Sequence, residues 1–186
     1  RARSVADRAR PAEAGLSVAF GPVLWNDTVL AARLVERILE AADGADREAL
    51  GVVLVSQGAP PEWEHAHREA TRQENYFNQR VRLLLTESGL VERAVRIAWL
   101  DWQLPDVTEA VRHVAALGCT TIGVAPSTIA WPSLESVAEL EHSIDLARLP
   151  GSVRVVTLPF WGDDEGLAAA VARSAAAALD AAESPG

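Results

Sequence analysis

The stretch Thr121–His142, which reads TIGVAPSTIAWPSLESVAELEH, decides the fold. Its apolar start, from Ile122 to Pro126, is short and uninterrupted, as is typical of a parallel strand buried on both faces. Ser133 stands where a helix N-cap is expected, and the spacing after it predicts a helix over 134–146. The stretch therefore predicts a buried strand, a loop and a covering helix.

Three side chains of that helix are able to do chemistry. Glu135, Glu139 and His142 follow one another at i, i+4 and i+7, which places them on one helix face. Two carboxylates and an imidazole can hold a divalent metal or move protons. The alternative is structural, because Glu135 also suits the first turn of a helix and the other two suit a solvated face.

Strands and helices alternate along the rest of the chain. Strands are predicted over 15–20, 51–56, 94–100, 120–126 and 153–158, and helices over 1–14, 29–43, 62–87, 106–117, 134–146 and 164–182. The alternation indicates an α/β protein with a doubly wound, flavodoxin-like parallel sheet between two helix layers.

The chain also contains an imperfect repeat. Gly15, Trp25, Asp27 and Arg37 recur at constant offset as Gly151, Trp161, Asp163 and Arg173, and SVAD at 4–7 matches SVAE at 136–139. We interpret 1–50 as the remnant of a first module and 51–186 as a complete second one, with a strand–helix–strand–helix–strand portion expected before residue 1. Chance convergence of two amphipathic units is the alternative.

Composition excludes several function classes. The formal charge of −9 leaves no basic face for nucleic acid, and no apolar run approaches the roughly 18 residues needed to span a bilayer. Cys119 is the only cysteine, so no disulfide framework or cysteine-ligated cluster forms within this chain. There is no glycine-rich phosphate loop, and we expect no organic cofactor. We expect a cytoplasmic protein.

Tryptophans gather at one edge of the expected sheet. Trp25, Trp99, Trp131 and Trp161 lie at or just after predicted strand ends, and Trp102 follows shortly after. Ligands of open α/β sheets bind at the carboxyl edge, so this placement predicts an aromatic platform for a large planar ligand. Alternatively, the tryptophans only plug the open end of the sheet.

Several short motifs resemble one family. VSQGAP at 55–60, WLDWQLP at 99–105, ALG at 116–118 and YFNQ at 76–79, together with the Glu135/Glu139 pair, are similar to the class II tetrapyrrole chelatases. The resemblance implies a two-half protein that inserts a divalent metal, Co²⁺ or Fe²⁺, into a tetrapyrrole such as sirohydrochlorin or a porphyrin.

The resemblance also implies roles for particular residues. Glu135 matches the site glutamate, Glu139 the next acidic residue along that helix, and Gln57 stands at the position of the site histidine. Their shared helix face makes Glu135, Glu139 and His142 the predicted metal ligands. The substrate is expected to contact Ser56 and Gly58 together with four tryptophans, namely Trp99, Trp102, Trp131 and Trp161.

Gln57 leaves two functions open, because its amide neither accepts a proton nor binds metal well. Either the chain is the C-terminal part of a chelatase, whose histidine comes from the missing module or a second chain, or it is a degenerate module. The degenerate module would bind a tetrapyrrole or a partner without metal insertion. We expect Gln57 and Glu135 to face one cleft.

Overall fold

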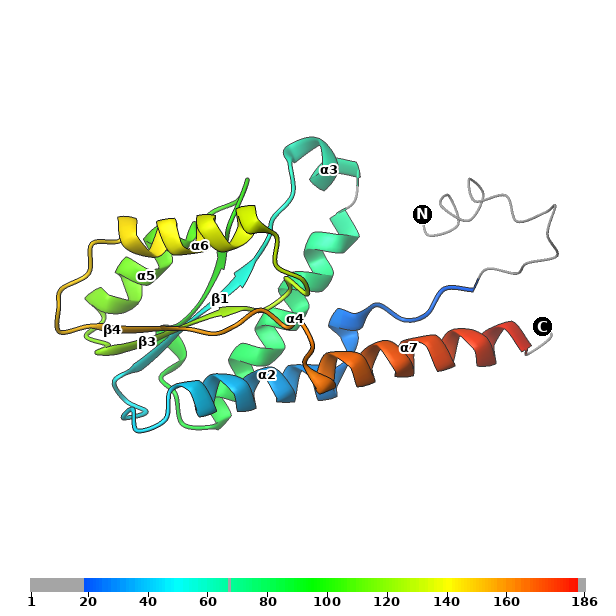
Figure 1. Ribbon diagram of the computed structural model, residues 1–186, viewed down its shortest axis with the longest axis horizontal. Coiled ribbons are helices and arrows are strands. Elements are labelled where there is room, and N and C mark those ends of the chain that lie inside the picture. Colours follow the sequence, from blue (N-terminus) through cyan, green and yellow to red (C-terminus); the bar gives the residue numbers. More distant parts are fainter. Residues whose placement is uncertain (1–18, 67, 184–186) are drawn as a thin grey trace.

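Four parallel strands form the sheet of the computed structural model, which describes residues 19–66 and 68–183 (Figure 1). They are β1 (Leu50–Ser56), β2 (Val95–Trp99), β3 (Thr121–Pro126) and β4 (Arg154–Thr157), in the order β2-β1-β3-β4. All three pairings are parallel. The predicted doubly wound α/β fold is confirmed.

Helices cover both faces of the sheet. One face carries α2 (Thr28–Ala41), α4 (Arg68–Glu87) and α7 (Glu165–Glu183), and the other carries α5 (Val107–Ala116) and α6 (Leu134–Leu146). The side chains of β1 alternate accordingly: Leu50, Val52 and Leu54 join the core beneath the first layer, whereas Val53 and Val55 join the second core. Strand alternation thus builds two separate apolar cores.

The strand order places a switch point between β1 and β3. The chain leaves β1 toward β2 through α3 (Pro61–Ala66) and α4 on one face, then returns through α5 on the other face to β3. In open α/β sheets this reversal leaves a crevice at the carboxyl ends of the two strands. The residues after β1 and β3 therefore lie where such folds bind ligands.

The decisive stretch folds as its pattern predicts. Ser133 is the N-cap of α6, where its Oγ accepts a hydrogen bond from Ser136 N at 3.0 Å. In return Ser136 Oγ accepts from Ser133 N at 2.9 Å, which closes a capping box. The cap fixes the start of α6, and with it the direction of the three side chains predicted to share one face.

Two predicted elements need correction. The strand expected over 15–20 is wrong for Ala19 and Phe20, which lie outside the sheet, and the rest of it falls outside the described residues. Phe20 is exposed, and Ser174 of α7 donates a hydrogen bond to Pro22 O at 2.7 Å, so the chain here runs along α7. The helix expected over 62–87 forms as α3 and α4, and the helix expected over 1–14 lies outside the described residues.

Helices α2 and α7 are joined by crossed ion pairs, in which Asp164 also pairs with Arg33 of α2 at 3.4 Å. Arg173 of α7 pairs with Asp27, the N-cap of α2, at 2.6 Å, and Arg37 of α2 lies 3.6 Å from Asp164 at the start of α7. Each arginine therefore reaches the N-terminal end of the other helix, so the two helices run antiparallel. Burial lowers the pKa of Arg37, and its guanidinium lies 4.7 Å from the centre of the Trp161 ring.

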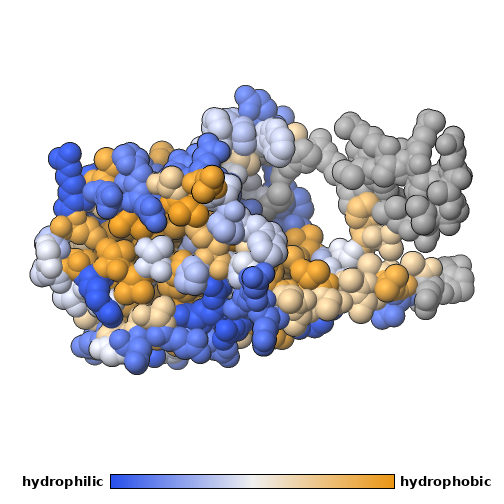
Figure 2. Space-filling view, in the orientation of Figure 1, coloured by the Kyte–Doolittle hydropathy of each residue, from blue (hydrophilic) through white to orange (hydrophobic). Residues whose placement is uncertain are grey.

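Apolar residues also reach the surface. Figure 2 shows a band of them (orange) between the polar outer surfaces of the helix layers, where Figure 1 places the edge strand β4. The exposed part of α7 adds Val171 and Leu179. In the described part of the chain, no helix is both long and apolar enough to cross a membrane.

Candidate functional site

Two loops meet at the carboxyl edge of the sheet, beside the switch point. Gln57 Nε2 donates a hydrogen bond to Asp101 Oδ2 at 2.7 Å, and Asp101 N donates to Gln57 O at 2.9 Å. The Ser56 hydroxyl contacts Asn78 of α4, and Gln57 follows Ser56 directly, beyond the end of β1. The strand ends therefore hold an amide and a carboxylate in fixed contact.

Gly58 permits this close approach. Its φ is +89°, a left-handed conformation, and a Cβ at this position would collide with the backbone carbonyl oxygen of Asp101. A glycine is therefore required for the two loops to touch, which is a structural role. The predicted contact of Gly58 with substrate stays a prediction.

Replacing Gly58 by Ala is expected to lower the free energy of unfolding by roughly 2–4 kcal/mol, from the left-handed conformation and the collision together. Gly89→Ala is the matched control, because Gly89 has a φ of +97° and open space around its Cβ position. Urea unfolding of both variants separates the two costs. Equal losses in the two variants would show that the contact with Asp101 does not constrain residue 58.

Helix α6 brings Glu139 to Asp101. Burial, the charge of Asp101, a hydrogen bond with Asp101 and the charge of Glu135 all raise the pKa of Glu139, whereas His142 lowers it. Two carboxyl groups that share a hydrogen bond hold a proton more strongly than either would alone. We call Gln57, Asp101 and Glu139 the acid cluster; it can accept a proton or offer oxygen atoms to a cation.

The three predicted metal ligands lie on one helix, as expected, but they are not gathered into a site. Glu135 and His142 are exposed, and they act on Glu139 only through their charges. Among the described residues, no three His, Cys, Asp or Glu side chains are placed to hold a metal ion together. Metal binding by Glu135, Glu139 and His142 stays a prediction.

The four predicted substrate tryptophans divide into two pairs. Trp102 and Trp131 are each 66% exposed, whereas Trp99 and Trp161 are buried. Trp161 donates through Nε1 to Ser127 O at 2.8 Å, so it plugs the sheet end as in the alternative interpretation. Leu104, two residues after Trp102, and Leu134, three residues after Trp131, are also exposed, Leu134 at 94%. Trp131 lines a pocket with residues that follow β4 and with Leu167, Ala168 and Val171 of α7. Large exposed apolar side chains of this kind indicate a binding surface when they are contiguous.

A buried polar network lies on the α4 side of the same edge. The Ser56 hydroxyl lies 2.9 Å from both Asn78 Nδ2 and Thr128 Oγ1. Thr128 also hydrogen-bonds Glu74, which lowers the pKa of that carboxyl, but burial outweighs this and raises the pKa to about 7. Ser56 is fully buried by these partners, and its predicted substrate contact stays a prediction.

Known proteins resemble this chain in structure and not detectably in sequence. No family model and no curated protein sequence matches it. SirB from Bacillus subtilis, solved with Fe³⁺, superimposes with a TM-score of 0.62 at 19% identity over 97% of this chain. DR2241 from Deinococcus radiodurans, a multi-domain protein described as structurally similar to chelatases, gives 0.55 at 14% identity over 81%. This chain has a chelatase-like fold.

The chelatase-like chain spans 64% of the length of SirB and 30% of that of DR2241. At such identities the likeness establishes the fold alone. It agrees with the fold that the motifs implied.

Sequence reasoning missed four residues of this edge: Glu74, Asn78, Asp101 and Thr128. Asp101 could have been predicted as a site residue, because it lies in the WLDWQLP motif directly after a strand. Asn78 also lies in YFNQ, one of the motifs that resemble the chelatases. Nothing in the sequence marked Glu74, which is one of several acidic residues on a polar helix.

Proposed function

We propose that this chain is the C-terminal part of a tetrapyrrole metal chelatase, which inserts a divalent metal, Co²⁺ or Fe²⁺, into a macrocycle held over the carboxyl edge. The observation that carries the proposal is the Asp101–Glu139 pair, in which Asp101 directly precedes the exposed Trp102 in the chain. The metal is a substrate, and no organic cofactor takes part.

The chemistry needs a proton acceptor next to a planar hydrophobic surface. Two pyrrole N–H protons must leave the macrocycle, and a carboxyl pair with raised proton affinity is suited to accept one of them. Carboxylate oxygens also exchange readily with hydrated divalent ions, so Glu135 and Glu139 are suited to deliver the metal. Trp102 and Trp131 offer the flat apolar contact for the ring.

Part of the site is proposed to lie outside 51–186. Gln57 stabilises Asp101 but cannot take a proton, so a second proton acceptor comes from another module or another chain. The greater length of SirB and the multi-domain build of DR2241 support a further module. The division at residue 50 remains part of this proposal.

A second candidate, tetrapyrrole binding without metal insertion, is favoured by Gln57 itself. An optical titration distinguishes the two: the chain is mixed with sirohydrochlorin or coproporphyrin under anaerobic conditions, with and without Co²⁺ or Fe²⁺. Metal-dependent conversion of the absorption bands above the rate without protein supports the chelatase. Binding without conversion supports the second candidate, and absence of binding contradicts both.

Trp102 gives a separate test of the platform. Its φ of +64° is unfavourable for a bulky L-residue by about 1–2 kcal/mol, although its side chain is exposed and gains little from packing. Trp102→Gly is therefore expected to keep or raise the melting temperature while weakening tetrapyrrole binding about fivefold to tenfold. Trp102→Phe, which keeps a flat ring, should retain most of the binding. If Trp102→Gly binds the tetrapyrrole as tightly as the parent chain does, Trp102 does not contact the ring.

A further inference from the structure

One acid of the carboxyl edge has no part in the chemistry proposed above. Glu74 of α4 belongs to the polar network that it forms with Ser56, Asn78 and Thr128 on the α4 side of the edge. Ser56 and Asn78 are fully buried and Thr128 is 7% exposed, whereas Glu74 is partly exposed. Glu74 is therefore the member of the network that solvent or a ligand can reach.

The network lies at the switch point of the sheet. Ser56 ends β1 and Thr128 follows β3, and their hydroxyl oxygens are 2.9 Å apart between the two strand ends. Helix α4 runs from the carboxyl edge back toward the start of β2, so Glu74, four residues before Asn78, lies about 6 Å nearer to that edge. The Glu74 carboxyl group therefore stands at the rim of the crevice in which open α/β sheets bind ligands.

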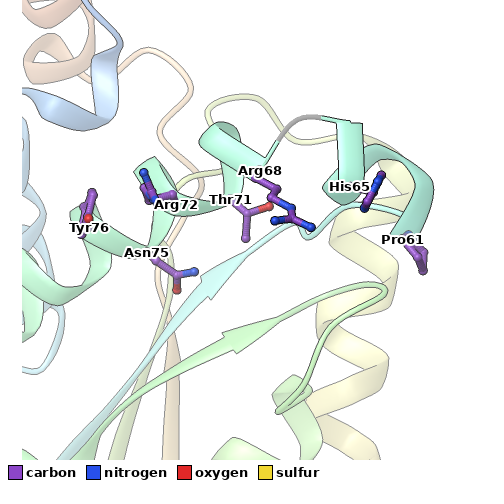
Figure 3. A pocket seen from close by; sticks show the side chains of 7 residues that line it. All are labelled: Pro61, His65, Arg68, Thr71, Arg72, Asn75 and Tyr76. Atoms are coloured by element: carbon purple, nitrogen blue, oxygen red, sulfur yellow. The ribbon is translucent and has the colours of Figure 1, made fainter.

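No cation balances the charge of Glu74. In the part of the chain that the structure describes, no arginine or histidine forms an ion pair with it, and no charged group of α4 or of the elements packed against α4 shifts its pKa. Arg68 and Arg72, on the same helix, instead line an open pocket of about 620 Å³ to which Glu74 does not contribute (Figure 3). Burial raises the pKa of Glu74 to about 7, against an opposite effect of Thr128.

The network can serve Glu74 in either protonation state. Asn78 Nδ2 donates to Ser56 Oγ at 2.9 Å, and the two hydroxyl groups can each turn their proton. Thr128 donates to the ionised Glu74 carboxylate, or accepts from the neutral acid and donates onward to Ser56. Glu74 can therefore gain or lose a proton without breaking its contact with Thr128. A perturbed acid of this kind beside a crevice is a candidate for function.

We propose that Glu74 is a ligand-contacting residue of the switch point, and that it meets the bound tetrapyrrole as a neutral acid, so that binding takes up a proton from solvent. This inference rests on the proposed function for the identity of its ligand. A macrocycle over the edge removes water from the exposed part of Glu74, and a carboxyl group that loses water without gaining a cation favours its neutral form. The proton adds to the Glu74 carboxylate, and no bond of the ligand changes.

Ligand affinity should therefore fall as pH rises. Below about pH 7 Glu74 is already neutral in the free chain, so binding leaves its proton in place. Above that pH the free chain holds Glu74 ionised, and binding has to restore the proton, which weakens the affinity. Glu74→Gln has a neutral amide at every pH, so it should bind at pH 8 as the parent chain does at low pH.

Isothermal titration calorimetry measures the proton directly. Metal-free coproporphyrin is titrated into the parent chain, Glu74→Gln and Glu87→Gln at pH 8 and at pH 6, each time in two buffers of different ionisation enthalpy. The difference in heat between the buffers gives the number of protons taken up per ligand bound. Glu87→Gln is the matched control, because Glu87 is an exposed glutamate at the end of the same helix. Urea unfolding confirms that each variant is folded.

At pH 8 the parent chain and Glu87→Gln should each take up about half a proton or more beyond Glu74→Gln, and at pH 6 the three should agree within about a tenth of a proton. The ratio of the parent Kd to the Glu74→Gln Kd should rise about fivefold to tenfold from pH 6 to pH 8. Taking this ratio cancels any titration of the porphyrin itself.

Carbon-13 NMR of the glutamate side chains is a second measurement. The carboxyl signal that is missing from Glu74→Gln should titrate near pH 7 in the free parent chain and at higher pH in the complex. Equal proton uptake by Glu74→Gln and the parent at pH 8 would overturn the inference and leave the proposed function intact. Proton release that depends on Glu74 would also overturn it, because the ligand would then pair with the ionised carboxylate. Failure of both coproporphyrin and sirohydrochlorin to bind would overturn the proposed function as well.

Discussion

Glu139→Gln is expected to slow metal insertion at least a hundredfold while leaving tetrapyrrole affinity within about twofold, because it removes the proton acceptor but none of the aromatic surface. The amide keeps the shape of the side chain and can still hydrogen-bond Asp101. The measurement is the initial rate of metal-dependent band conversion, with Kd measured in parallel without metal.

Glu141→Gln is the control for this prediction. Glu141 is an exposed carboxylate on the same helix, two residues further on and hence on a different face. It should leave the rate unchanged. A Glu139→Gln variant as active as Glu141→Gln would exclude the acid cluster from the chemistry, whatever the substrate.

The rate should also depend on pH in a defined direction. Because burial and Asp101 raise the pKa of Glu139, the ionised form that accepts a proton becomes populated only above the ordinary range of a glutamate. Metal insertion should therefore increase as pH rises through that pKa, and this increase should be absent from the residual activity of Glu139→Gln.

Glu74→Gln is expected to raise the free energy of unfolding by about 3 kcal/mol at pH 8 and to change it little at pH 4. Glu74 has a pKa of about 7 when folded against an ordinary value of 4.5. Between those values the folded chain keeps a proton that the unfolded chain has lost, so stability falls by about 1.36 kcal/mol per pH unit. Above about pH 7 the loss is complete and constant.

Urea unfolding at a series of pH values measures this effect, and Glu87→Gln, an exposed change at the end of the same helix, is the control. The parent chain and Glu87→Gln should both lose stability from about pH 4.5 to pH 7, and Glu74→Gln should lose less. Parallel curves for all three proteins would mean that Glu74 is not buried as a neutral acid beside Thr128.

The elements that could be predicted are those whose signal is local. The apolar run before Pro126 and the cap at Ser133 fix β3 and α6 without reference to the rest of the chain. The predicted strand over 15–20 is wrong in its described part, because Ala19 and Phe20 have the right composition but no strand to pair with. Pairing is a property of the whole sheet.

The site was harder to predict because it is made of contacts between distant segments. Asp101 reaches Gln57 only because β2 lies next to β1, and Glu139 reaches Asp101 only because α6 covers that face. The tryptophans were hard to predict for the same reason. Trp131 and Trp161 both follow strands, yet Trp161 is buried by packing and Trp131 is exposed. Periodicity shows which positions face inward, but not how deeply each is covered.

The crossed pairing of α2 and α7 has a consequence for how the chain reaches its fold. Asp27 and Arg173 are separated by 146 positions, and α7 leaves the ribosome after every other described element. Contacts of such separation form late, because the entropy of closing the loop must be lost first. The layer of α5 and α6 can close earlier in synthesis, whereas the core beneath α2 and α4 stays open until α7 has been synthesised. That side of the sheet is therefore where a nascent chain is most exposed to aggregation and most in need of a chaperone.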